Sequence, residues 1–485
     1  MSVIRLSPAL ASQEVFPQLP AISAALARKD STIWGAQYSE EISRRLDWID
    51  LSHSSRELLP LLDSLWVWAR ERKFQRIILA GMGGSSLAAQ VIAQSHNKDL
   101  LVLDSTDPDS VNGALAQDLG ESLLIVSSKS GTTIETLTHW AIFEAEMRGV
   151  GIDPTEQIII ITDPDSPLDI QGRKSGYRVF HGNPKVGGRY SALSIFGLLP
   201  AALLGIDVSL LLDDADEALI EILQESSPAT KVASYLAQER FFLIKDSANA
   251  LGGFGLWVEQ LIAESTGKDG KGILPLARNE NAFGLPTIDL ASDLIAPLGA
   301  QFILWQWISA LLGALLEVNP FDQPDVESSK KETVALLELA SRDQKVISGE
   351  ELLERLEQVS QVRDIGYISL QIYLDQRSNE KIEELQVLLE KRYQRPVSIS
   401  WGPALLHSTG QFHKGGPQVG VFIQITGDSE IDIAIPGKNQ SLQQLILAQA
   451  DGDAKALEAK KNPVYRVHLS KRKSGIETLL KIFKS

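Results

Sequence analysis

The sequence predicts an α/β fold with mainly parallel sheets, because short apolar segments of strand type alternate with segments of helical spacing. A buried parallel strand reads as a continuous apolar run, and several segments here do so. Helical segments long enough to form crossovers separate them, as parallel strands require. The strand-like segments of the first half are residues 76–80, 100–105, 123–127, 157–162 and 177–180, and the helical ones are 56–71, 87–94, 133–147 and 192–204.

A second series of strands and helices begins near residue 241, so we divide the chain into parts. A length of 485 residues suggests two or three domains. We expect a helical N-terminal arm (1–49), a first α/β domain (50–235) and a second α/β domain (236–485). In the second domain we expect strands at 241–245, 272–276, 367–373, 397–401, 419–426, 432–435 and 464–468, and helices at 254–264, 297–318, 379–392 and 442–450.

Composition excludes several classes of function. The net charge of −16 argues against broad binding to nucleic acid or to anionic membranes, so an anionic ligand needs a locally positive pocket. Lys129 and Arg189 are candidates for that pocket. The absence of cysteine rules out disulfides and thiolate chemistry and fits a cytoplasmic protein without a secretory signal. The apolar stretches 194–206 and 302–316 predict buried helices rather than membrane spans.

The stretch 123–136 predicts a cradle for an anion. Its apolar strand is followed by a small polar turn, and a helical pattern begins at Thr133. A helix start directs unpaired N–H groups and the positive end of the dipole at a ligand. Ser128, Ser130 and Thr133 could add hydroxyl groups, and Lys129 adds a positive charge. The alternative is a Ser/Thr-rich turn that merely caps a helix.

Two other glycine-containing turns are candidates for the same site. G-M-G-G-S-S (81–86) resembles a dinucleotide fingerprint, but Ser86 replaces the third glycine and a turn sequence follows Asp104. We therefore expect it to offer amides and the hydroxyl of Ser85 to the anion. In V-G-G-R-Y-S (186–191), Gly188 would let the backbone approach a ligand beside Arg189. Arg189 could alternatively be a structural ion-pair partner.

A carboxylate suited to act as a base occurs in Q-L-I-A-E-S-T-G-K (260–268). Glu264 lies at the end of an apolar helix, away from the helix N-terminus that would stabilise its charge. Farther along, N-P-F-D-Q-P (319–324) follows the long apolar helix, and another helix is expected to carry Lys330.

Together these motifs resemble the phosphoglucose isomerase family, whose members contain two doubly wound sugar-isomerase domains. Five motifs occur in family order, the fifth being N-P-F-D-Q-P-D-V-E-S-S-K (319–330). The residues beyond about 395 resemble the isomerase half of bifunctional transaldolase–phosphoglucose isomerases. This resemblance implies interconversion of glucose 6-phosphate and fructose 6-phosphate through an enediolate, with no cofactor or metal, in a cytoplasmic homodimer.

The resemblance also implies a role for each site residue. Ser85, Ser128, Lys129, Ser130 and Thr133 would hold the phosphate. Glu264 would move a proton between C2 and C1 as general base and acid, and Arg189 would stabilise the charge on oxygen. Gly188, Gln260 and Gln323 would line the pocket, with Lys330 near the ring oxygen.

The ring-opening histidine departs from the family order. Bacterial members carry it in an L-H-S-x-G-Q segment soon after the glutamate, where this chain has R-N-E-N-A-F (278–283). The segment L-H-S-T-G-Q occurs instead at 406–411, so we assign ring opening to His407, with His413 as its rival. A structural histidine or a metal pair is the alternative for these two.

Two other functions remain open from sequence. The same site could also isomerise mannose 6-phosphate, since discrimination at C2 depends on pocket shape. A non-catalytic sugar-phosphate sensor could use the same cradle, although it would not need Glu264, Arg189, Lys330 and a histidine together.

Overall fold

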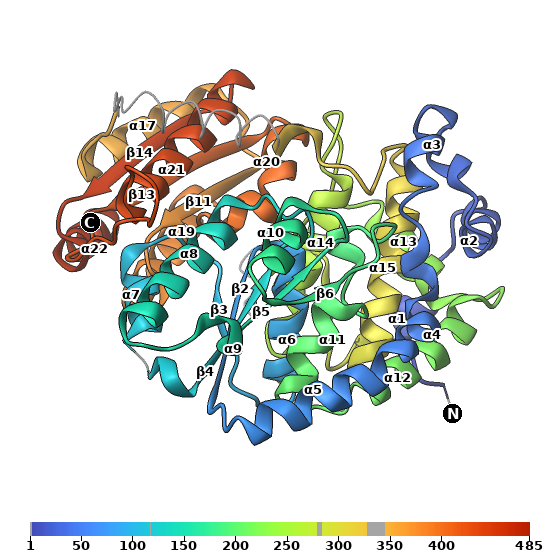
Figure 1. Ribbon diagram of the computed structural model, residues 1–485. Helices are drawn as coiled ribbons and strands as arrows, with labels where there is room; N and C mark the ends of the chain where they lie inside the picture. The colour runs from blue at the N-terminus through green and yellow to red at the C-terminus, as the bar shows by residue number, and fades with distance from the viewer. Residues whose placement is uncertain (1, 117, 279–283, 327–344) are drawn as a thin grey trace. The chain divides into compact units, whose positions relative to one another are not determined.

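The computed structural model describes residues 2–116, 118–278, 284–326 and 345–485, and the chain divides into two compact units (Figure 1). The first unit comprises Met1–Asp104, Gln117–Asn281 and Leu285–Asp322. The second unit comprises Ser105–Ala116, Ala282–Gly284 and Gln323–Ser485. Each unit has its own parallel sheets, which confirms the prediction of an α/β fold.

The main sheet of the first unit has five parallel strands in the order β3-β2-β4-β5-β6. This is the doubly wound order in which the direction of winding changes between the first and third strands in sequence, here β2 and β4. β4 and β5 are buried along their whole length and apolar except at their ends, as expected of central parallel strands. The strands are β2 (Arg76–Gly81), β3 (Leu101–Leu103), β4 (Ser122–Ser127), β5 (Ile158–Thr162) and β6 (Arg178–His181).

A smaller parallel sheet of the first unit has the order β8-β7-β9. A short antiparallel pair joins β1 near the N-terminus to β10. The strands are β1 (Arg5–Leu6), β7 (Phe241–Lys245), β8 (Leu274–Ala277), β9 (Thr287–Asp289) and β10 (Leu294–Ile295).

A large apolar core of the first unit includes residues of β2, β4, β7 and α15. The helices are α1 (Pro8–Ala11), α2 (Leu19–Ala27), α3 (Ser39–Ile42), α4 (Leu51–Ser54), α5 (Leu59–Glu71), α6 (Leu87–Ser95), α8 (Ile134–Gly149), α9 (Pro154–Gln157), α10 (Pro167–Lys174), α11 (Ile195–Leu203), α12 (Val208–Ile222), α13 (Pro228–Leu236), α14 (Phe254–Thr266) and α15 (Leu298–Leu315). Short 3₁₀ turns add η1 (Ser31–Trp34), η2 (Ala36–Tyr38), η3 (Asp47–Asp50), η4 (Ser55–Leu58), η5 (Gly83–Ser85), η6 (Leu119–Glu121) and η7 (Gly188–Tyr190).

Helix α15 is the centre of the helical layer, packing against α12, α13 and α14. Among the described helices it alone has the length and apolar composition to cross a membrane, and 94% of that stretch is buried inside the structure. The two predicted buried helices, 194–206 and 302–316, correspond to α11 and α15, which are buried almost throughout. Their apolar composition is explained by burial on all sides.

The second unit has a four-stranded parallel sheet in the order β12-β11-β13-β14. The alternation of side chains gives the sheet two different faces. Ile368, Leu370 and Ile372 belong to an apolar core, whereas Ser369 and Gln371 between them are buried polar side chains. The strands are β11 (Tyr367–Tyr373), β12 (Val397–Trp401), β13 (Gly420–Gly427) and β14 (Val464–Leu469).

The helices of the second unit include one from the first half of the sequence. They are α7 (Pro108–Leu115), α17 (Gly349–Val362), α18 (Gln376–Asn379), α19 (Glu384–Tyr393), α20 (Gly410–Gly415), α21 (Leu442–Ala459) and α22 (Arg472–Lys484), with 3₁₀ turns η8 (Glu380–Glu383) and η9 (Ala404–His407). The boundary expected at residue 235 therefore does not coincide with the division of the chain. β7, β8 and β9 join the first unit, and 105–116 joins the second.

Two local predictions in the second unit differ from the structure. The expected strand 432–435 is wrong, since Ala434 forms only an isolated bridge to Ser441 around a turn at Gly437. The expected helix 379–392 is divided into α18, η8 and α19. In both places the local composition does not reveal the hydrogen bonds that interrupt the regular element.

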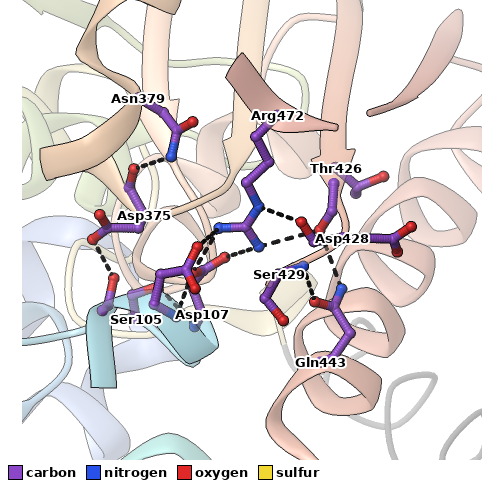
Figure 2. A network of polar contacts seen from close by, with 12 residues as sticks. Ser105, Asp107, Asp375, Asn379, Thr426, Asp428, Ser429, Gln443 and Arg472 are labelled. Carbon is purple, nitrogen blue, oxygen red and sulfur yellow. Dashed lines mark hydrogen bonds and ion pairs between the residues drawn. The ribbon is translucent and has the colours of Figure 1, made fainter. Parts of the chain in front are cut away.

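A polar network around Arg472 holds α7 within the second unit (Figure 2). The Arg472 guanidinium contacts Asp107 at 2.8 Å and Asp109 at 2.8 Å, and its Nε donates to the carbonyl of Asp428 at 2.9 Å. The side chain of Arg472 is 9% exposed and that of Asp107 is fully buried. Burial raises the pKa of Asp107, although Arg472 opposes the shift. The network also ties Ser110 of α7 to Asp375, at 2.6 Å.

We expect Arg472→Met to lower the free energy of unfolding by about 3–5 kcal/mol, because it leaves the buried charge of Asp107 without its partner. The matched control is Lys484→Met in the same helix, where the ion pair with Glu384 is about half exposed. That change should cost less than about 1 kcal/mol. Urea denaturation of both variants measures the difference, and equal effects would contradict a stabilising role for the network.

Candidate active site

The candidate site lies at the carboxyl ends of β2 and β4, where the winding of the five-stranded sheet changes direction. Open α/β sheets bind ligands at this position. The turn 81–86 follows β2 and contains η5, and the turn 128–133 follows β4 and leads into α8. The fold thus brings together the two turns that the sequence predicts to bind an anion.

Close backbone packing joins these turns to the segment that carries Arg189. Ser127 Oγ donates to the carbonyl of Ser85 at 2.8 Å, and Ser191 Oγ donates to the carbonyl of Gly84 at 3.2 Å. A Cβ atom on Gly84 would lie 2.3 Å from the carbonyl oxygen of Gly188. Gly84 is therefore required for this approach, and the three turns form one continuous surface.

The turn after β4 has the features of an anion cradle. Ser128 and Thr133 share a hydrogen bond of 2.8 Å between their hydroxyls, and Ser130 and Thr132 share one of 3.0 Å. Gly131 adopts a φ of +69°, which directs the chain into the N-terminus of the 16-residue helix α8. The first N–H groups of a helix have no partners within it and attract anions. The hydroxyls and this helix end supply the donors that a phosphate needs.

Lys129, which the sequence assigns to the cradle, pairs with a carboxylate. Its ammonium lies 2.7 Å from both carboxylate oxygens of Asp163 and donates to the carbonyl of Asn183 at 2.8 Å. Burial lowers the pKa of Lys129 and raises that of Asp163, with the attraction between them opposing both shifts. The charge of Arg45, from the N-terminal arm, also acts on this pair. Lys129 thus anchors the cradle to β5, while its charge is largely balanced by Asp163.

The chemically distinctive feature of the site is a buried ion pair between Arg189 and Glu264. Arg189 Nη1 lies 2.7 Å from Glu264 Oε1, and the two side chains are 5% and 9% exposed. Gln260, one helical turn before Glu264 on α14, donates to Glu264 Oε2 at 3.2 Å. A carboxylate beside a fixed guanidinium can exchange a proton with a ligand while the cation stabilises negative charge on it.

Three further acceptors fix the orientation of the Arg189 guanidinium. Its Nε donates to Ser265 Oγ at 3.2 Å, and Nη2 donates to the carbonyls of Pro320 at 2.9 Å and Asp322 at 3.2 Å. The contacts of Arg189 therefore include α14 and the segment that follows α15.

Aromatic packing from the N-terminal arm supports the same region. Tyr190 lies next to Arg189, and its ring centroid is 4.9 Å from that of Trp48 and 5.0 Å from that of Phe321. Trp34 contacts Phe321 edge-on at 5.2 Å, and its indole nitrogen donates to the carbonyl of Ala310 at 2.9 Å. The arm carries no candidate catalytic residue, but it contributes the apolar packing beneath the site.

The remaining predicted site residues belong to the second unit or lie outside the described residues. Gln323 and His407 belong to the second unit. Lys330 lies outside the described residues. The first unit therefore contains the cradle, Gly188, Arg189, Gln260 and Glu264.

His413, the rival of His407, is a buried residue of the second unit. Its Nδ1 lies 2.8 Å from the hydroxyl of Tyr367, its Nε2 lies 3.4 Å from Ser369 Oγ, and its ring stacks on Tyr367. Burial lowers its pKa to about 3, so the ring is neutral at physiological pH. This is the environment of a structural histidine, whereas His407 at the end of η9 is partly exposed.

Sequence reasoning missed two residues of the cluster. Asp163, which pairs with Lys129, follows β5 in an ordinary turn sequence, and nothing in that sequence indicates a role in the site. Lys268 is buried beside Arg189 and Glu264, and it stood within the motif 260–268 without an assigned role. Among the described residues, no group of three or more histidine, aspartate or glutamate side chains is arranged to hold a metal ion.

Comparison with known proteins finds similarity in this part of the chain. Residues 52–237, which include the cradle and Arg189, match the family model for phosphoglucose isomerase. The similarity to the phosphoglucose isomerase family covers this region. It contains the first three motifs of the resemblance, which end at residue 191. Glu264 and the last two motifs follow the matched region.

Two relatives named glucose-6-phosphate isomerase match this chain over stretches of similar length. A probable glucose-6-phosphate isomerase of Haloarcula marismortui is 34% identical over 212 residues, covering 41% of this chain and 49% of the relative. A glucose-6-phosphate isomerase of a Synechococcus species is 36% identical over 214 residues, covering 40% of each chain. The chain thus matches half or less of the length of these relatives.

A solved structure shows the shared fold over a longer stretch. The glucose-6-phosphate isomerase of Chlamydia trachomatis superposes with a TM-score of 0.50 at 19% identity, covering 70% of this chain and 81% of that one. The likeness to this phosphoglucose isomerase supports the α/β architecture with parallel sheets that is described above.

The depressed pKa of His413 predicts a pH dependence of stability. Between its ordinary 6.5 and about 3, the unfolded chain binds a proton that the folded chain does not. The free energy of unfolding should therefore fall with decreasing pH across this window, by up to about 1.4 kcal/mol per pH unit from this one group. Urea denaturation at a series of pH values measures the slope.

His413→Gln should remove this contribution, so its slope should be shallower than that of the wild type. His53→Gln is the control, because His53 is exposed and its change should leave the slope as it is. Identical slopes for the wild type and His413→Gln would contradict the burial argument.

Proposed function

We propose that this chain interconverts glucose 6-phosphate and fructose 6-phosphate. The observation that carries the proposal is the buried Arg189–Glu264 pair, which is continuous through the Gly84–Gly188 contact with an anion cradle. An aldose–ketose isomerase needs a hold on the phosphate, a base over C1 and C2, and positive charge near the enediolate. The first unit offers a group for each of these.

In this mechanism the cradle binds the phosphate and thereby positions the distal carbons. Binding energy from the phosphate is converted into orientation of C1 and C2 over Glu264. The Glu264 carboxylate takes the proton from C2 of the open-chain aldose, which gives an enediolate. A proton is transferred from O2 to O1, and the protonated carboxyl group returns its proton to C1. The product is the ketose, and Glu264 regains its charge.

Arg189 would stabilise the negative charge that develops on the substrate oxygen. Its guanidinium is held by Ser265 and two backbone carbonyls, so it does not need to reorganise as the charge forms. His407 is our candidate for opening the sugar ring, and the family resemblance assigns Gln260 and Gln323 to substrate binding and Lys330 to the ring oxygen. The homodimer and the cytoplasmic location implied by the family resemblance stay predictions, and light scattering of the purified chain tests the first.

Two alternatives differ in class from a glucose-specific enzyme. Activity on mannose 6-phosphate would require the same residues, so only an assay with that substrate separates it. A non-catalytic sensor of sugar phosphates would need the cradle but no buried base beside a guanidinium. The Arg189–Glu264 pair therefore favours catalysis.

The direct test is a coupled assay that follows glucose 6-phosphate formation from fructose 6-phosphate. We expect Glu264→Gln to lower kcat by at least about 100-fold, because the amide cannot carry the proton between C2 and C1. Binding of fructose 6-phosphate, measured by calorimetry, should be nearly unchanged. The control is Glu317→Gln, at an exposed position after α15.

The outcomes of this assay are distinct. Near-normal turnover by Glu264→Gln would overturn the assignment of the base. A wild-type protein that binds fructose 6-phosphate without converting it would favour the sensor. His407→Ala is assayed separately with ring-opened and cyclic substrate, since ring opening is the step assigned to it.

The cradle makes its own prediction. We expect the double variant Ser128→Ala, Thr133→Val to raise KM for fructose 6-phosphate by roughly 10-fold or more, because each lost hydrogen bond to a charged group weakens binding. Ser64→Ala serves as the control, since that hydroxyl donates to the Pro60 carbonyl within α5. Steady-state kinetics measures KM, and an unchanged value would mean that the phosphate binds elsewhere.

A further inference from the structure

Lys268 is a buried cation that the mechanism above leaves without a role. It follows the C-terminus of α14, and the residue is 4% exposed. Its ammonium donates to the carbonyl of Ser265 at 3.1 Å and to the carbonyl of Asn319, and it lies 3.1 Å from Asp322 Oδ1. Two carbonyl acceptors and one carboxylate in ion-pair contact therefore surround the ammonium.

The acceptors of Lys268 belong to the same elements that hold Arg189. The segment 319–322 receives Lys268 at Asn319 and Asp322, and it receives Arg189 at the carbonyls of Pro320 and Asp322. Both cations thus bind one four-residue stretch of chain. A shift of this stretch would move the acceptors that orient the guanidinium.

Ser265 is a second link between the two cations. Its carbonyl accepts from Lys268, and its hydroxyl accepts from Arg189 Nε at 3.2 Å. Ser265 directly follows Glu264, so the same turn of helix carries the base, an acceptor for Arg189 and an acceptor for Lys268. Lys268 therefore contacts both Ser265 and the segment 319–322, which together supply the acceptors that orient the Arg189 guanidinium.

The charges around Lys268 agree with this arrangement. Arg189 and Lys268 face the carboxylates of Glu264 and Asp322, and Glu41 contacts Asn319 at 3.1 Å. Burial, together with the charge of Arg189, lowers the pKa of Lys268 to about 7, while Asp322 and Glu264 oppose the shift. A cation kept in such a place must be matched by its acceptors, because an unpaired buried charge is costly.

We propose that Lys268 is a positioning residue for the isomerase site, which fixes the segment 319–322 and Ser265 and thereby holds Arg189 in its orientation against Glu264. This inference rests on the proposed function. Lys268 acts through Arg189 and not on the substrate, so its loss should slow the chemical step while leaving the phosphate cradle intact.

The experiment compares Lys268→Met with Lys268→Arg and with the control Lys271→Met. Lys271 lies three residues later and also donates to a backbone carbonyl, that of Leu316 at 2.8 Å, but its side chain is 43% exposed. Small displacements of catalytic groups cost up to about 100-fold in rate, so we expect Lys268→Met to lower kcat by about 10- to 100-fold. KM for fructose 6-phosphate should stay within about threefold of the wild type, because uniform binding is not removed.

A purely structural lysine would not produce the expected pH profile. Lys268 loses its proton as pH rises through about 7, so kcat of the wild type should fall on the alkaline side of that value. Lys268→Arg keeps the charge at higher pH and should move this decline upward by more than one pH unit, while Lys271→Met should leave it in place.

The failures of the two proposals are distinguishable. A wild-type protein without isomerase activity would overturn the proposed function, and this inference with it. If the wild type is active and Lys268→Met has normal kcat, only the role of Lys268 is overturned. Should Lys268→Met not fold, Asp322→Asn provides the second variant, because it removes the ion pair and keeps the carbonyl that binds Arg189. Unchanged kcat in Asp322→Asn would also overturn the positioning role.

Discussion

The buried ion pair between Arg189 and Glu264 is the interaction on which the arrangement of the first unit depends. Both side chains are almost fully removed from solvent, so each charge is tolerated only because the other is present. The pair obliges η7 and α14 to meet, although their residues are far apart in sequence. The additional acceptors at Ser265, Pro320 and Asp322 make this meeting geometrically specific.

Close backbone approach connects the ion pair to the cradle. Gly84 touches the Gly188 backbone at a distance that leaves no space for a Cβ atom. The position is set by the change of winding between β2 and β4, which opens a crevice at the carboxyl ends of these strands. The topology of the sheet therefore determines where the cradle and the Arg189 segment meet. Lys129 and Asp163 extend it by fastening the cradle to the end of β5.

Ion pairs connect the second unit to residues 105–116, a segment from the first half of the sequence. Residues 105–116 lie between β3 and β4 in sequence, yet Asp107 and Asp109 pair with Arg472 more than three hundred residues later. Because Asp107 is fully buried, its charge needs Arg472 as a partner, and the position of residues 105–116 depends on this ion pair. On the polar face of the sheet, His413 is held by Tyr367 and Ser369.

The sequence by itself determined the α/β class, the parallel strands of the first sheet and the start of α8 to within one residue, expected at Thr133 and found at Ile134, because apolar periodicity and helix starts are local properties. It also identified Arg189 and Glu264 as candidates from their motifs. Only the tertiary structure decided that β7–β9 join the first unit, that Lys129 pairs with Asp163 and that Lys268 is buried beside Arg189. These features depend on contacts between residues distant in sequence, and no local pattern encodes which partner a buried charge will meet.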